Sequence, residues 1–97
     1  MDSELSNEMI VCLMILKLSR DPPGHGPVSY NELSDALDGL VCPMEMSADL
    51  DYLYDLGMID AGWTWKDGRW KRAFSISEDA EGFVESAYLR STLSERM

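Results

Sequence analysis

Half of the cationic residues of this chain lie close together. Four of the eight lysine and arginine residues fall between Trp65 and Phe74, although the formal net charge of the chain is −10. They are Lys66, Arg69, Lys71 and Arg72. Lysine and arginine bind phosphate groups and release the counterions condensed around them. Because the acidic remainder of the chain repels polyanions, a phosphate-bearing partner would have to meet this local patch.

Other residues that could do chemistry are scattered. His25 is the only histidine and has no metal-ligand residues beside it in a recognised pattern, so we expect a loop residue. The acidic pairs Asp49/Asp51 and Glu78/Asp79 are expected on solvated helix surfaces. No set of nucleophile, base and oxyanion donors can be assembled. The sequence therefore predicts no enzymatic activity, no metal site and no cofactor.

Cysteine content and hydropathy indicate an intracellular protein. Cys12 and Cys42 form no disulfide or metal pattern, and we expect both to be reduced and buried. The longest apolar run, Met9 to Leu16, is much shorter than the roughly 20 residues that cross a bilayer. We expect one globular domain over residues 1–97, with a core at about 6–88, a cytoplasmic location and no membrane partner.

The cationic patch lies in a predicted β-hairpin. Apolar and polar residues alternate from Met58 to Ile76, and Asp67-Gly68 favours a two-residue type I′ turn. This turn places Lys66 opposite Arg69, Trp65 opposite Trp70 and Trp63 opposite Arg72. Trp63 and Trp65 are expected to pack on the first and last helices, and Arg72 is expected to lie against Trp63 in a cation–π contact. Lys66, Arg69 and Lys71 are expected to point outward.

A helix is predicted on the N-terminal side of this hairpin from Ser6 to about Ser19, with Ser6 as its cap. Its apolar residues surround the helix axis, so it lies either in the centre of the core or against a partner subunit. Ser29 and Glu32 match the capping box of a second helix that reaches about Leu37.

Two further helices complete the pattern. Pro43 can open a third helix through Leu56, with Gly57 as its C-terminal cap. Its predicted buried stripe is Leu50, Leu53 and Leu56. Ser77 is expected to cap a last helix at about 78–96. Its inward residues are predicted to be Ala80, Phe83, Val84, Ala87 and Tyr88.

The predicted order is helix, helix-turn-helix, two-stranded hairpin and helix, which gives an α+β class that is mostly α. This order resembles the winged-helix domain, in which the hairpin is the wing. The segment LDYLYDLGMI, Leu50 to Ile59, resembles the junction of recognition helix and wing. The segment GRWKRAFSISEDAEGF, Gly68 to Phe83, is similar to the second wing strand and following helix of PadR-like and related archaeal or bacterial regulators.

The resemblance implies a transcriptional regulator that binds DNA as a dimer, with the third helix in the major groove and the wing on phosphate or in the minor groove. The wing contacts would be Lys66, Arg69, Lys71 and Arg72, with Ser47 and Tyr52 as weaker contacts from the third helix. The third helix, however, contains acidic residues and no lysine or arginine. A homodimer would form through the first and last helices. Its candidate interface residues are Met9, Leu13, Leu16, Tyr88, Leu89 and Leu93.

A second hypothesis follows from the acidic third helix. A winged helix can also bind proteins, and the third helix could then dock on a basic partner with little or no DNA binding. Both hypotheses require the same fold.

Overall fold

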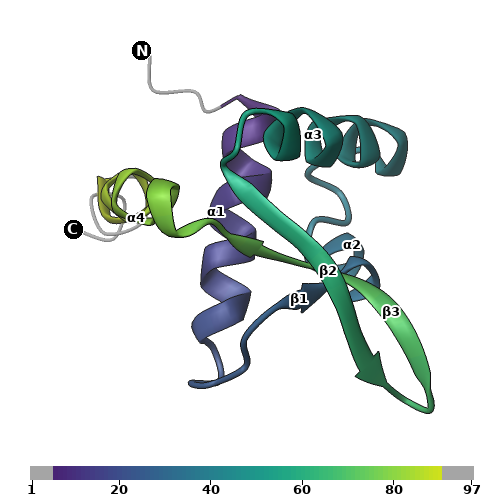
Figure 1. The fold of residues 1–97 in the computed structure, drawn as a ribbon. Coiled ribbons are helices and arrows are strands. Elements are labelled where there is room, and N and C mark those ends of the chain that lie inside the picture. Colours follow the sequence, from purple (N-terminus) through teal and green to yellow (C-terminus); the bar gives the residue numbers. More distant parts are fainter. Residues whose placement is uncertain (1–5, 91–97) are drawn as a thin grey trace.

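The computed structural model describes residues 6–90 and confirms the expected α+β class (Figure 1). In chain order the elements are α1 (Asn7–Arg20), β1 (Val28–Ser29), α2 (Tyr30–Ala36), α3 (Pro43–Asp55), β2 (Ile59–Lys66), β3 (Arg69–Ile76), the 3₁₀ turn η1 (Glu78–Ala80) and α4 (Glu81–Tyr88). No helix within this described part is long and apolar enough to cross a membrane.

Helix α1 runs through the centre of the molecule (Figure 1). Of the two positions expected for this apolar helix, the centre of the core is therefore the one observed. The Met9 N–H donates to Ser6 Oγ at 3.2 Å, so Ser6 caps the helix as predicted. The buried residues of α1 are Val11, Cys12, Leu13, Ile15 and Leu16. Burial raises the pKa of the Cys12 thiol to about 11. The prediction for Cys42 was wrong, because this residue is exposed at the start of α3.

Helices α2 and α3 form the helix-turn-helix. The capping box is confirmed, since Ser29 Oγ accepts from the Glu32 N–H and Glu32 Oε1 accepts from the Ser29 N–H. Helix α3 ends at Asp55, and Gly57, two residues further on, has a φ of +79°. The next N–H, that of Met58, donates back to Leu53 O at 3.0 Å. Leu50 and Leu53 are buried, as is Met46. Leu56 is exposed, contrary to expectation, and lies just beyond the helix as its C-cap residue.

The hairpin register is the predicted one. Asp67 and Gly68 both have positive φ, +55° and +79°, as a type I′ turn requires. The pairs Lys66/Arg69, Trp65/Trp70 and Trp63/Arg72 lie opposite each other. The sheet nevertheless has three strands rather than two, because β1 pairs with β3. Burial of both β1 residues beside Phe74 and Ala73 favours this pairing.

The segment after the hairpin differs most from the prediction. Ser77 does not cap a helix with its side chain. It is buried, and its Oγ donates to Gly57 O at 2.7 Å. A 3₁₀ turn separates Ser77 from α4, and Phe83, predicted to face inward, is exposed. Val84 and Ala87 face the core as expected. The predicted helix beyond residue 90 lies outside the described residues.

Candidate nucleic-acid interface

The wing, defined here as the hairpin Ile59–Ile76, has two faces of different chemistry. Side chains alternate between the faces of a strand, and the register sets which residues share a face. One face, here called the aromatic face, carries Trp63, Trp65, Trp70 and Arg72 near the tip. The opposite face, called the cationic face, carries Thr64, Lys66, Arg69 and Lys71. The four cations of the sequence patch are therefore divided between two surfaces.

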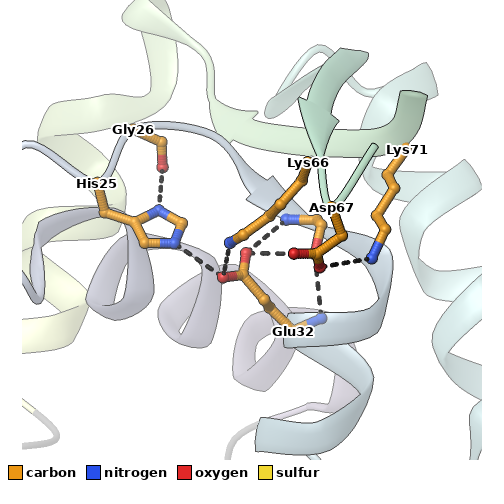
Figure 2. Close-up of polar contacts among 7 residues, drawn as sticks. His25, Gly26, Glu32, Lys66, Asp67 and Lys71 are labelled. Carbon is orange, nitrogen blue, oxygen red and sulfur yellow. Dashed lines mark hydrogen bonds and ion pairs between the residues drawn. The ribbon is translucent and has the colours of Figure 1, made fainter. Parts of the chain in front are cut away.

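Lys66 is paired with an acid of the helix-turn-helix. Its Nζ donates to Glu32 Oε2, so the tip of β2 is tied to the first turn of α2 (Figure 2). The other carboxylate oxygen, Oε1, accepts from the Ser29 N–H at 3.0 Å and from Ser29 Oγ at 3.2 Å. One carboxylate thus closes the capping box and binds a wing cation.

His25 joins the same carboxylate, which the sequence did not indicate. Its Nε2 lies 3.0 Å from Glu32 Oε2 and its Nδ1 lies 3.1 Å from Gly26 O (Figure 2). Both partners are acceptors, so an imidazolium that donates from both nitrogens satisfies them best. The hydrogen bond with Glu32, followed by that with Gly26, raises the pKa of His25 above its ordinary value.

The Glu32 carboxyl responds in the opposite direction. Burial alone would raise its pKa, but hydrogen bonds from Lys66, His25 and Ser29 outweigh this effect and lower the pKa to about 2. Glu32 is therefore ionised at any physiological pH. No group of three or more metal-ligating side chains among residues 6–90 could hold a metal ion.

The remaining cations differ in availability. Lys71 Nζ lies 3.5 Å from Asp67 Oδ2, and its side chain is mostly covered. Arg72 lies over two rings on its side of the sheet, 5.9 Å from the centroid of Trp63 and 5.4 Å from that of Phe74, which lies nearer the base of the hairpin. The predicted contact with Trp63 is confirmed. Arg69 at the tip is exposed and has no ion-pair partner among the residues that the structure describes.

The tryptophans do not pack on the first and last helices, so that prediction was wrong. Trp63, Trp65 and Trp70 are 65%, 59% and 62% exposed. The physical reason is that the tip of the hairpin extends past the helices (Figure 1), while Ile59 and Phe74 at its base fill the core. Trp65 and Trp70 instead contact each other edge to face, with ring centroids 5.4 Å apart.

Helix α3 presents an acidic surface. Ser47 and Tyr52 are exposed as expected, and Ser47 Oγ is within 2.9 Å of the Tyr30 hydroxyl. The acids of α3 are Glu45, Asp49, Asp51 and Asp55. Burial, and then the charges of Glu8 and Glu45, raise the pKa of Asp49. Its Oδ2 atom is buried without a hydrogen-bond partner in the described part of the chain.

The residues predicted for a dimer interface differ in their exposure. Leu13 and Leu16 lie in the core of the subunit itself, so they are not available to a partner. Met9 and Tyr88 are partly buried against that core. Leu89 is exposed, and Leu93 lies outside the described residues.

Comparison with known proteins identifies the fold. No protein-family model matches the chain, and no curated protein matches it. Among solved structures, smu.1704 from Streptococcus mutans is similar, with a TM-score of 0.70 at 11% identity over 98% of this chain and 87% of that one. The adhesin competence repressor AdcR from Streptococcus pyogenes has a TM-score of 0.68 at 17% identity, over 99% of this chain and 63% of its own.

Bacillus subtilis PadR, crystallised in complex with operator DNA, has a TM-score of 0.60 at 17% identity. The alignment covers 84% of this chain and 48% of PadR, so the chain spans about half the length of PadR. These likenesses, with the helix-turn-helix and hairpin described above, show that the chain has a winged-helix fold.

Proposed function

We propose that this chain is a transcriptional regulator that contacts DNA mainly through the cationic face of its wing. Two of the similar proteins support the regulator class, since AdcR is described as a repressor and PadR was crystallised with operator DNA.

The observation that carries the proposal is the position of Arg69. It lies exposed at the wing tip of a protein whose net charge is −10, with Lys66 and Lys71 on the same face. Lys66 and Lys71 are paired with Glu32 and Asp67, but partly exposed ion pairs contribute only about 0–1 kcal/mol. A DNA phosphate can therefore compete for both lysines. Arg72 is excluded from these contacts because it lies on the aromatic face.

Helix α3 has a smaller part in this proposal. Ser47 and Tyr52 are exposed polar side chains of α3 that could contact bases, and they stand among carboxylates that repel phosphate. Affinity then comes from the wing, and each phosphate contact contributes about −0.9 to the slope of log K against log salt. A homodimer would double the number of wing contacts, and exposed Phe83 and Leu89 on and just after α4 support such a contact. A regulator of this kind would work in the cytoplasm.

The test is a titration of random duplex DNA at about 50 mM and about 200 mM salt. We expect measurable binding at the lower salt, and a clear loss in Arg69→Ala and in the double variant Lys66→Ala/Arg69→Ala. Lys17→Ala removes one charge from an exposed position on α1 and serves as the matched control. Absence of binding at low salt, or equal losses in the Arg69 and Lys17 variants, would contradict the proposal. Sedimentation at tens of micromolar tests the dimer.

A second candidate function is favoured by the acidic surface of α3. The helix has no base to offset Glu45, Asp51 and Asp55, which suits a basic protein partner better than DNA. If the chain does not bind DNA at low salt in the titration above, that result would support protein binding and contradict the proposed DNA binding.

A further inference from the structure

The aromatic face is exposed to solvent, although its side chains are of a kind that folding usually buries. All three tryptophans of the protein lie on it, each about three-fifths exposed. Large aromatic side chains are normally buried on folding, and contiguous exposed apolar patches mark binding surfaces. Tryptophan, tyrosine and arginine are also the residues most enriched at the centres of protein interfaces.

A groove continues this face toward α3. It has a volume of about 280 Å³ and lies between the second half of α3 and the wing. Leu50, Asp51 and Tyr54 line it from α3, and Trp63, Arg72 and Phe74 line it from the wing. Aromatic rings, an acid and an open groove therefore lie side by side on one surface.

The charges around this surface indicate the occupant. Asp51 lines the groove, Asp55 follows on the same helix, and α3 contributes no positive charge. DNA phosphate is repelled by these acids, and a second copy of the chain carries the same charge of −10. Arg72 shows that a guanidinium can lie against the rings of this face, between Trp63 and Phe74. Trp65 and Trp70, which contact each other edge to face, remain open to solvent.

We propose that the aromatic face and the groove beside α3 bind a segment of a partner protein in which lysine or arginine residues alternate with apolar ones. The apolar side chains cover Trp65 and Trp70, and the cations meet Asp51 and the open ring faces. This site is independent of DNA binding by the opposite face of the wing, and it gives the protein-binding alternative a defined surface.

The test uses three labelled synthetic peptides of equal length and measures fluorescence anisotropy with the full chain. The first alternates lysine and leucine, the second replaces leucine with serine at unchanged charge, and the third replaces lysine with glutamate. We expect only the first to bind well. The double variant Trp65→Ala/Trp70→Ala should bind it at least about tenfold more weakly. Asp51→Asn should also weaken it.

Matched variants separate this site from general attraction to an acidic protein. Leu40→Ala removes an exposed apolar side chain elsewhere, and this variant should bind the first peptide as the wild type does. Circular dichroism checks that every variant is folded. Binding of the serine peptide as tight as that of the leucine peptide, no loss in the tryptophan variant, or no binding of any peptide would overturn the proposal.

DNA binding and the oligomeric state of the tryptophan variant test whether DNA or a second copy of the chain occupies the aromatic face instead. If the tryptophan variant loses DNA binding as Arg69→Ala does, the aromatic face is a DNA contact and the partner assignment fails. If the wild type is a dimer that the tryptophan variant dissociates, the occupant is a second copy and the assignment also fails. Arg69→Ala should leave peptide binding unchanged, because Arg69 lies on the opposite face of the wing. The peptide-binding proposal can therefore hold even if the DNA-binding proposal fails.

Discussion

Lys66 on the wing and Glu32 at the start of α2 form an ion pair that ties the hairpin to the helix-turn-helix. The same carboxylate binds His25 and closes the capping box. The sequence predicts that Lys66 points outward from the hairpin, but in the structure its ammonium group is bound by a carboxylate of the helix-turn-helix. The wing has less free positive charge than its composition indicates.

Releasing Lys66 should strengthen DNA binding. Glutamine at position 32 can still accept from the Ser29 N–H, as capping boxes with glutamine do, but it does not hold Lys66 by charge. We expect Glu32→Gln to increase DNA affinity at low salt by up to about fivefold, the equivalent of about 1 kcal/mol. The salt slope should become steeper by about 0.9 if Lys66 gains a phosphate contact.

Asp35→Asn is the control for this prediction, because it removes one negative charge from an exposed position of the same helix. It should increase affinity less than Glu32→Gln does. Combining Glu32→Gln with Lys66→Met should abolish the additional gain. Equal gains in the Asp35 and Glu32 variants would show that only net charge matters.

His25 is expected to stabilise the fold when it is protonated. Its pKa in the folded chain is raised above the ordinary 6.5, so the folded state binds this proton more tightly than the unfolded chain does. The stabilisation is present in full below pH 6.5 and is lost as the pH rises through the raised value. His25→Ala should therefore lower the free energy of unfolding most below pH 6.5 and least in alkaline buffer, measured by urea unfolding at several pH values.

The histidine can be followed directly, because the chain contains no other. Its NMR titration should give a pKa above 6.5 in the wild type and a lower one in Glu32→Gln. The charges that face it are Glu32 and Asp35 on α2, Asp21 in the preceding loop and Lys66 on the wing. An unchanged titration in Glu32→Gln would mean that Glu32 is not the controlling partner.

Ser77 offers a test of the junction between wing and α4. A helix cap accepts a hydrogen bond, whereas this buried hydroxyl donates one to Gly57 O. Ser77→Ala should lower the free energy of unfolding by about 1–2 kcal/mol. Ser77→Asp should destabilise the fold further, because an ionised carboxylate would face the carbonyl oxygen. If aspartate is tolerated better than alanine, the serine acts as a cap after all. Ser86→Ala, at an exposed position of α4, should have little effect.

Removing the charge of Asp49 should stabilise the domain. Its pKa is raised by burial and by Glu8 and Glu45, so above that pKa the folded state carries an unfavourable charge. Asp49→Asn should raise the free energy of unfolding at neutral pH by about 1 kcal/mol. Because acid protonates Asp49, the difference should shrink as the pH falls below its pKa. Asp51→Asn, at an exposed position on the same helix, should give a smaller change.

The elements that sequence reasoning predicted correctly depend on local chemistry. Asp67-Gly68 sets the hairpin turn and its register, Ser29 and Glu32 set the start of α2, and Gly57 ends α3, because each signal acts within a few residues. The confirmed contact between Arg72 and Trp63 followed from that register alone.

The features that were missed depend on packing between distant segments. Pairing of β1 with β3 and the bond from Ser77 to Gly57 join residues far apart in the chain. Burial of Trp63 and Trp65 was expected from their hydrophobicity, but it depends on how far the hairpin extends past the helices. In the candidate site, the sequence showed where the lysine and arginine residues of the wing lie, but not which groups they contact. The spacing of His25, Glu32 and Lys66 along the chain does not indicate that their side chains meet.

The position of the tryptophans also determines what their intrinsic emission can report. All three indole rings are already largely hydrated in the folded chain, and the core contains none. Loss of the core will therefore shift the emission maximum very little, whereas a molecule that covers the wing will shift it toward shorter wavelength. In this protein indole emission is a poor reporter of unfolding and a direct spectroscopic reporter of occupancy at the wing.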